Sequence, residues 1–181
     1  MQRIIRKILS MMTIFFAIIP VDKGYSSDHR APISIQDGFY RWNRIGTEPQ
    51  IQDFFQGFQK ENGWHPLRFP SGSLKTQESL LIWQGFILPE QKNHRQAWRD
   101  PVLFLDTVDQ DFEVYLSGKL IYKNGKMDKT GTGIFIGWGW HIIPLPKNFA
   151  NQKVILRIYS DHDNIGIVGT PRVGEREKFI T

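Results

Sequence analysis

The sequence predicts an all-β fold, an antiparallel β-sandwich, and three observations within residues 100–174 support this prediction. The run 101–105 is entirely apolar, as expected for a strand that is covered on both faces. Apolar and polar residues alternate over 111–116, which is typical of a strand with one buried face. Ser117-Gly118 and Asn124-Gly125 are turn sequences that join such strands into hairpins.

Further strands are expected on either side of these hairpins. The aromatic run 39–42 follows an Asp-Gly turn, and the apolar run 79–88 is ended by a proline. Segments 141–146 and 154–159 complete the set. Segment 50–59 can form a short helix or an irregular edge, because its glycine argues against a long helix. The pattern is that of one sandwich domain, without an internal repeat.

The N-terminus is expected to be an export signal. Basic residues precede an apolar stretch that is shorter than the roughly 20 residues of a membrane span. Residues 1–26 are therefore predicted to be a signal peptide, cleaved after Ser26, or an uncleaved anchor helix. The predicted division of the remaining chain is a lead-in at 27–34, the binding or sensor sandwich at 35–176 and a tail at 177–181. This predicts a periplasmic or other extracytoplasmic location.

Charge and composition exclude several classes of protein. The chain carries a formal charge of +5, with 23 basic and 18 acidic residues, and removal of residues 1–26 takes away four of the former and one of the latter, leaving +2. Nucleic-acid binding, which needs a concentrated basic face, is therefore not expected. The chain has no cysteine, which excludes thiol catalysis, cysteine-ligated zinc and iron–sulfur clusters.

A succession of short motifs resembles a known family, the extracytoplasmic N-terminal sensor domain of bacterial membrane signalling proteins. The motifs are Ile82-Trp83, Leu88-Pro89, the runs 101–105 and 111–119, a glycine-rich aromatic segment, Ile143-Pro144-Leu145-Pro146, and the runs 156–160 and 164–167. The resemblance covers about residues 35–175. It implies a jelly roll similar to the galactose-binding domain, the fold that also forms the sugar-binding domain of family 2 glycoside hydrolases.

In that family the domain precedes membrane helices and a cytoplasmic output, such as a diguanylate or adenylate cyclase, a histidine kinase or a serine phosphatase. This sequence ends at Thr181, so the resemblance implies a free-standing exported version or a truncated receptor. Association with a membrane would then come from an uncleaved signal anchor or from a missing C-terminal region. The expected partners are a small molecule, a glycan or an envelope protein.

Four residues are candidates for a ligand platform: Trp98, Trp138, Trp140 and His141. A flat aromatic ring can stack on the apolar face of a sugar while polar neighbours bind its hydroxyls. Trp138 and Trp140 are two residues apart, so they share one face if the segment is a strand. That face is either an exposed platform or part of the core.

Two groups of acidic residues invite a chemical interpretation. Asp161, Asp163 and Asn164 offer oxygen ligands for a hard cation such as Ca²⁺, and the alternative is a solvated turn. Asp111 and Glu113 lie on one face of the predicted strand about 7 Å apart, as paired carboxylates of a glycosidase could, and the alternative is the outward polar face of that strand. Apart from this possible Ca²⁺, no cofactor is expected.

The sequence thus favours a non-catalytic exported domain that binds a ligand or senses one. The alternatives are a carbohydrate-binding domain related to family 2 glycoside hydrolases, or a fragment of such an enzyme, and a structural envelope protein or receptor remnant. No recognisable catalytic motif, such as His-Glu-x-x-His or Gly-x-Ser-x-Gly, is present in the sequence.

Overall fold

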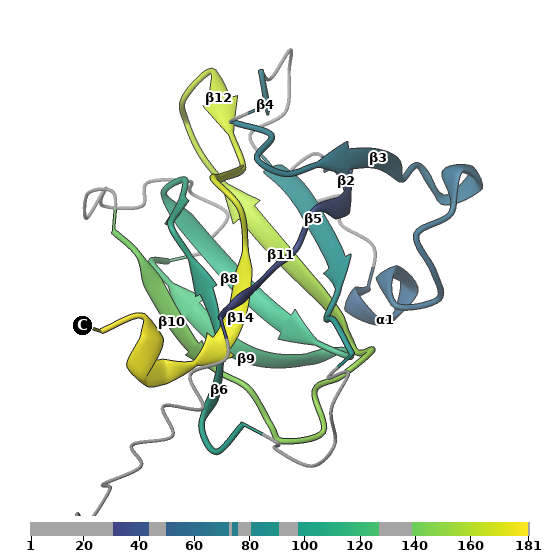
Figure 1. Cartoon of the computed structure of the whole chain (residues 1–181). Helices are drawn as coiled ribbons and strands as arrows, with labels where there is room; N and C mark the ends of the chain where they lie inside the picture. Colours follow the sequence, from purple (N-terminus) through teal and green to yellow (C-terminus); the bar gives the residue numbers. More distant parts are fainter. Residues whose placement is uncertain are drawn as a thin grey trace, which may run out of the picture.

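The structure, a computed structural model, describes residues 31–43, 50–72, 74–75, 81–90, 98–126 and 139–180 (Figure 1). The expected signal or anchor at 1–26 lies outside the described residues. Within the described ranges, no helix is long and apolar enough to cross a membrane.

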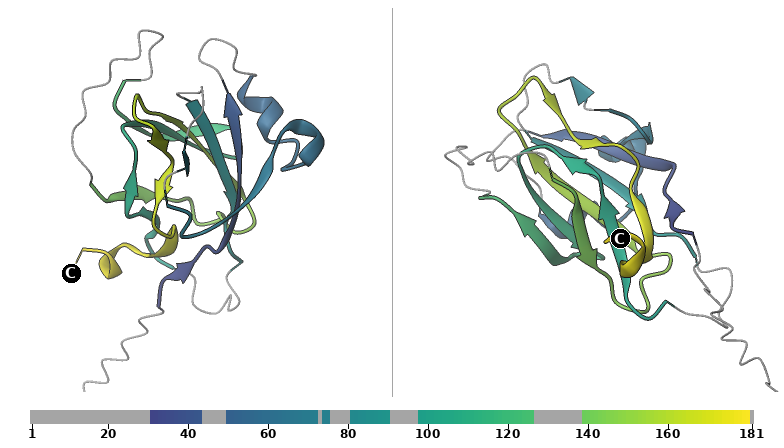
Figure 2. Two further views of the ribbon diagram at one scale, coloured as in Figure 1. Left: turned by 90° about the horizontal axis from the view of Figure 1, so that it is seen from above. Right: turned by 60° about the vertical axis from the view of Figure 1, so that its left-hand side comes forward.

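Two antiparallel sheets face each other and form a sandwich (Figure 2). The larger sheet has six strands, in the order β3 (His65–Arg68), β2 (Asp37–Asn43), β5 (Leu81–Ile87), β11 (Lys153–Tyr159), β8 (Asp111–Leu116) and β9 (Lys119–Asn124). The smaller sheet has four strands, in the order β1 (Ile33–Ser34), β14 (Arg172–Glu175), β6 (Pro101–Leu105) and β10 (His141–Pro144). The predicted all-β antiparallel fold is confirmed.

Short elements complete the fold. Two small ribbons pair β12 (Asn164–Ile165) with β4 (Leu74–Lys75) and β13 (Ile167–Val168) with β7 (Thr107–Val108). The described helical segments are α1 (Ile51–Phe54) and two 3₁₀ turns, η1 (Lys60–Asn62) and η3 (Arg176–Lys178). Segment 50–59 therefore contains only one helical turn, and its remaining residues are irregular.

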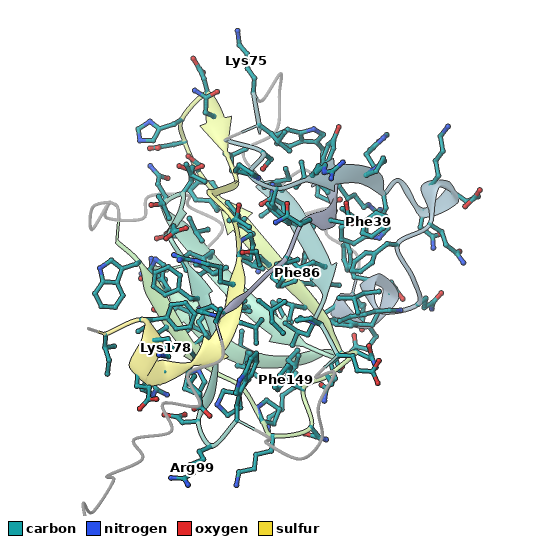
Figure 3. The ribbon with its side chains drawn as sticks, viewed as in Figure 1. Phe39, Lys75, Phe86, Arg99, Phe149 and Lys178 are labelled. Carbon is teal, nitrogen blue, oxygen red and sulfur yellow. The ribbon has the colours of Figure 1, made fainter. Side chains whose placement is uncertain are left out.

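The core lies between the two sheets and follows the alternation of the strands. Phe112, Val114 and Leu116 of β8 belong to this core, as predicted, together with Phe86 of β5 and the inward side chains of β6 and β11. Figure 3 labels Phe86 in the middle of the sandwich. Burial of these apolar side chains contributes about 25 cal/mol for each Å² removed from water, which makes this core the main source of stability.

The hairpin of β8 and β9 forms where its turn sequence predicts. Ser117 and Gly118 have φ values of 46° and 89°, the left-handed pair that a tight two-residue hairpin turn requires. This turn fixes the register in which Tyr115 pairs with Leu120, and an irregularity between Val114 and Tyr115 then shifts the pairing so that Glu113 lies opposite Lys123.

A buried glutamine joins the larger sheet to one of the small ribbons. Gln84 of β5 is fully buried, and its Oε1 accepts a hydrogen bond of 2.8 Å from the backbone N–H of Ile167. Gly166 lies against the same side chain, and a Cβ atom there would be 2.8 Å from Gln84 Nε2. A glycine at this position lets the ribbon approach the sheet.

Candidate functional site

Trp140 immediately precedes β10 and is exposed on the outer side of the four-stranded sheet, where 59% of its surface is accessible. In β10, Ile143 faces the core, so the alternation places Ile142 and Trp140 on the opposite, outer face. The ring of Trp140 stacks against Phe104 of β6, with centroids 6.2 Å apart and ring planes at 24°. The structure thus presents an exposed indole supported by a buried phenyl ring.

A charged pair lies beside these rings. The guanidinium carbon of Arg172 stands over the Phe104 ring at 4.6 Å from its centroid. Arg172 Nη2 donates a hydrogen bond of 2.8 Å to Asp106 Oδ1, and both side chains are partly accessible to solvent. Phe104 is therefore covered by Trp140 and Arg172, and the Asp106–Arg172 pair offers an acceptor and several donors next to the indole.

Phe179 completes this surface from the C-terminal end of the chain. Its ring stacks on Phe104 with centroids 4.6 Å apart and planes at 8°, and Arg172 lies 5.6 Å from the Phe179 centroid. The sequence predicted residues 177–181 to be a tail, whereas Phe179 packs on the sandwich. We call Phe104, Asp106, Trp140, Arg172 and Phe179 the Trp140 surface.

His141 follows Trp140 but faces the other way, into the seam between β10 and β9. Its Nδ1 is 3.1 Å from the Tyr122 hydroxyl, and its ring meets Phe112 edge to face at 4.7 Å. Burial lowers the pKa of His141 below its ordinary value and raises the pKa of Tyr122. His141 therefore helps to close the sandwich on this side and does not share the outer surface with Trp140.

The other two predicted platform residues do not join Trp140 either. Trp98 is only 5% exposed and stacks on Phe149 in the core, with centroids 5.7 Å apart and planes at 9°. Phe149 is labelled in the lower part of the sandwich in Figure 3. Trp138 lies outside the described residues. Of the four predicted ligand-binding residues, the structure therefore places only Trp140 on an exposed face of the described part.

The predicted calcium ligands lie in the exposed loop after β11. Asp161, Asp163 and Asn164 are all exposed. Asp161 and Gln110 form two hydrogen bonds with each other. Gln110 Nε2 donates to the Asp161 carboxylate, and the backbone N–H of Asp161 donates to Gln110 Oε1 at 3.0 Å. The described residues contain no group of three or more His, Cys, Asp or Glu side chains that could hold a metal ion. Calcium binding therefore stays a prediction.

Glu113 is held in a network of three donors on the outer face of the six-stranded sheet. Its Oε2 accepts from the Tyr115 hydroxyl at 2.7 Å and lies 3.3 Å from Arg157 Nη1, and its Oε1 lies 3.2 Å from Lys123 Nζ. Burial works to raise the pKa of Glu113, but these donors outweigh it and the pKa is lowered. Burial, together with the bond to Glu113, raises the pKa of Tyr115 to about 12.

This network corrects one expectation about the carboxylates of β8. Asp111 and Glu113 do share the face opposite to the core residues, as predicted, but they are not an exposed polar face, because only 2% and 7% of their surfaces are accessible. Both carboxylate oxygens of Glu113 already have a neighbour within the protein, the Tyr115 hydroxyl at Oε2 and the Lys123 ammonium at Oε1. The arrangement is that of a structural ion-pair network.

Aromatic residues also cover part of the outer face of the six-stranded sheet. We call Phe54, Trp64, Trp83 and Ile155, with the partly buried residues that pack on them, the outer cluster. Phe54 of α1 stacks on Trp83 of β5 with centroids 4.1 Å apart, and Trp64 meets Phe54 edge to face at 5.8 Å. These rings are sealed from solvent, so they form a second small core.

A shallow depression of about 380 Å³ lies elsewhere, between the β1–β2 connection and the end of β5. Ser34, Gln36 and Asp37 contribute polar groups to its lining, and Phe39, labelled in Figure 3, lies beside it. It is wide open, and none of the predicted site residues lines it.

Sequence reasoning missed four residues of the Trp140 surface: Phe104, Asp106, Arg172 and Phe179. Phe104 stands inside an apolar run, which predicts burial and not support of an exposed ring. The available signal was in the alternation of β6, since Phe104 points away from the core that Leu103 and Leu105 enter. Phe179 gave no signal, because its contact depends on how the chain turns back after β14.

Comparison with known proteins gives a fold and not a family. No family model and no curated protein matches the chain. Among solved structures, it is similar to a glycosyl hydrolase family 2 member from Bacteroides cellulosilyticus, with 7% identity, a TM-score of 0.56, and coverage of 79% of this chain and 20% of that chain. A β-glucuronidase of Bacteroides uniformis has 12% identity, a TM-score of 0.55, and coverage of 79% and 17%.

A third similar structure is the β-glucuronidase of Bifidobacterium dentium complexed with coumarin-3-O-glucuronide. It has 11% identity and a TM-score of 0.55, with coverage of 82% of this chain and 30% of that chain. The chain thus spans less than a third of the length of these enzymes. At such low identity the likeness supports the β-sandwich fold alone.

Proposed function

We propose that this protein is a non-catalytic recognition domain that binds its ligand at the Trp140 surface. The observation that carries the proposal is the exposed Trp140 ring, stacked on Phe104 beside the Asp106–Arg172 pair. An exposed indole of this kind retains apolar area that a ligand can cover, and the neighbouring pair supplies hydrogen-bonding groups that orient the ligand. By contrast, the carboxylate of Glu113 is engaged by its own neighbours.

We further propose that the domain is exported and that its sandwich is a jelly roll of the galactose-binding kind. In the leading form of the proposal it is the sensory domain of a bacterial signalling system, free-standing or part of a receptor. The likeness to glycoside hydrolases supports a second form, a carbohydrate-binding domain related to family 2 enzymes. A glycan fits both forms, because a pyranose has an apolar face for Trp140 and hydroxyls for Asp106 and Arg172.

A thermal-shift screen of residues 27–181 tests the proposal. The panel contains neutral oligosaccharides, uronic-acid oligosaccharides and small metabolites, and a ligand is recognised by a rise in the melting temperature of the domain. Isothermal titration of that ligand against Trp140→Ala should show a large loss of affinity, because stacking on the indole is removed. Arg172→Ala should weaken the same binding by removing the polar contacts.

Leu120→Ala is the matched control, because Leu120 is 45% exposed on the other sheet and this change removes an apolar side chain away from the Trp140 surface. It should bind like the parent. A ligand that binds Trp140→Ala as tightly as the parent would place the site elsewhere and overturn the proposal. Turnover of a screened oligosaccharide by the purified domain would show an enzyme and overturn the non-catalytic assignment.

A further inference from the structure

The C-terminal segment 175–180 and Trp140 rest on the same ring. Phe179 and Trp140 both stack on Phe104, with centroids 4.6 and 6.2 Å away, and Phe104 itself is only 7% exposed. Gly174 permits this arrangement, because a Cβ atom there would come within 3.2 Å of the Phe179 ring. Figure 3 labels Lys178 on the turn that carries Phe179 back onto the sheet.

The segment is anchored at a point that does not involve these rings. Arg176 Nε donates to Asp100 Oδ2 at 2.6 Å, and its backbone N–H donates to the Asp100 carbonyl at 3.1 Å. The Glu175 carboxylate accepts from the backbone N–H groups of Arg99 and Asp100. The turn η3 is thereby tied to the loop before β6, and Phe179 reaches Phe104 from this fixed base.

Arg172 contacts both the aromatic rings and the acidic residue of the Trp140 surface. Its guanidinium lies over both Phe104 and Phe179, while its Nη2 reaches Asp106. Departure of Phe179 would uncover one side of Phe104 and remove a ring on which Arg172 rests. The support of Trp140 and the position of the polar pair therefore both depend on whether the C-terminal turn is docked.

From this geometry we infer that the C-terminal turn is a positioning element of the Trp140 surface, so that docking of residues 175–180 and occupation of the surface are linked. Phe179 is the positioning residue, and Arg176 controls it through Asp100. Linkage of this kind is reciprocal: whatever favours the docked turn favours binding, and binding favours the docked turn. The part that concerns binding rests on the proposed function, whereas the coupling itself can be measured without a ligand.

The first measurement uses Arg176→Ala, which removes the side-chain hydrogen bonds between Arg176 and Asp100. It keeps the backbone bonds of the anchor and leaves every ring residue unchanged. Oxidative footprinting with mass spectrometry reports the reactivity of Trp140, and hydrogen exchange reports the amides of residues 176–180. We expect faster exchange of these amides and a several-fold change in Trp140 oxidation, since release of the turn alters the support beneath the indole. Arg176→Lys, which retains the cation, should restore both quantities toward the parent values.

The second measurement runs in the opposite direction. Trp140→Ala should accelerate exchange at the Phe179 amide, which donates to the Arg176 carbonyl at 3.0 Å in the docked turn. Leu120→Ala, a change to an exposed apolar residue on the other sheet, should leave that amide unchanged.

Two results would overturn the inference. The first is that Trp140 in Arg176→Ala is oxidised at the parent rate although the amides of the turn exchange faster. The second is that the Phe179 amide exchanges at the parent rate in Trp140→Ala. Both results would leave the proposed function intact, because ligand binding to a surface that does not respond to the turn would still be lost in Trp140→Ala. Conversely, failure to find a ligand would not affect the coupling.

Discussion

The two outer faces of the sandwich carry similar residues and use them differently. On the six-stranded sheet, Trp83 is covered by Phe54, which Trp64 meets in turn, and only 1% of Trp64 is accessible. On the four-stranded sheet, Phe104 is covered by Phe179 and by Trp140, whose own ring stays 59% exposed. The rings of the first face form a second small core, whereas on the second face, within the described residues, the Trp140 ring stays largely exposed.

The polar groups of the two faces also differ in how far neighbouring side chains enclose them. Glu113 is surrounded by Tyr115, Lys123 and Arg157, so its carboxylate is satisfied within the protein. Arg172 and Asp106 form a simpler pair that is partly accessible to solvent. If the Trp140 surface binds a ligand as proposed, the difference between the faces is that an outward aromatic residue serves binding where the described part of the chain leaves it exposed and polar groups lie nearby.

The largest expected effect separates the two faces by stability. Trp64→Ala should lower the free energy of unfolding by roughly 3–5 kcal/mol, because it opens a cavity in the outer cluster. Trp140→Ala should lower it by about 1 kcal/mol or less, because only one side of that ring is packed. Urea unfolding of both variants measures the difference. Equal losses would mean that the two faces are not distinct.

A smaller effect is expected at the ion-pair network. Glu113→Gln should cost about 1–3 kcal/mol, because Lys123 and Arg157 lose the carboxylate that they surround in a nearly buried place. The lowered pKa of Glu113 means that its contribution is present above its ordinary value of 4.5 and is lost as pH falls through the lower folded-state pKa.

Acid unfolding of the parent and the variant measures this contribution. The free-energy difference between the two proteins should shrink below about pH 4.5 as the parent carboxylate is protonated. A difference that stays constant down to acid pH would show that the ionised form of Glu113 is not what the network stabilises.

The seam at His141 should add a modest dependence on pH. Burial lowers its folded-state pKa below the ordinary 6.5, so the unfolded chain binds the proton more readily, and stability is lost as pH falls through about 6.5. His141→Gln should flatten the melting temperature between about pH 8 and pH 5.5. A slope in His141→Gln equal to the parent slope would assign the dependence to another group.

The smallest expected effect concerns calcium. If the loop after β11 binds the ion, calcium should raise the melting temperature of the parent and should not do so in the double variant Asp161→Ala with Asp163→Ala. Magnesium at the same concentration is the control for ionic strength. A parent whose melting temperature does not respond to calcium removes the prediction.

The sequence was sufficient to predict the hairpins, because alternation and turn residues act locally. Residues 111–116 form β8 and residues 101–105 form β6 with the predicted bounds, and Ser117 and Gly118 adopt the left-handed conformation that their turn needs. It could not predict the covering of the outer cluster, because the single turn of α1 is too short to show a helical period.

The candidate site could be predicted only in part, because exposure of a ring is decided by distant segments. Trp98 and Trp140 both contact another aromatic ring, but their exposure differs. Trp98 stacks on Phe149 in the core and is 5% exposed, whereas Trp140 is 59% exposed. Trp140 was predicted from its spacing. Alternation along β6 could have placed Phe104 on the outer face, but Arg172 and Phe179 reach it only after β6 and β14 pair, so no local pattern predicts their contact.

The most direct test of ligand binding at the Trp140 surface follows the indole N–H signal of Trp140 in a ¹⁵N NMR spectrum. The signal is assigned by its loss in Trp140→Phe, and the ligand from the thermal-shift screen is then added stepwise. Binding at the Trp140 surface predicts that this signal moves with saturation at the affinity found by titration calorimetry, while the buried indole of Trp64 stays in place. A Trp140 signal that does not move while the ligand binds would contradict the account.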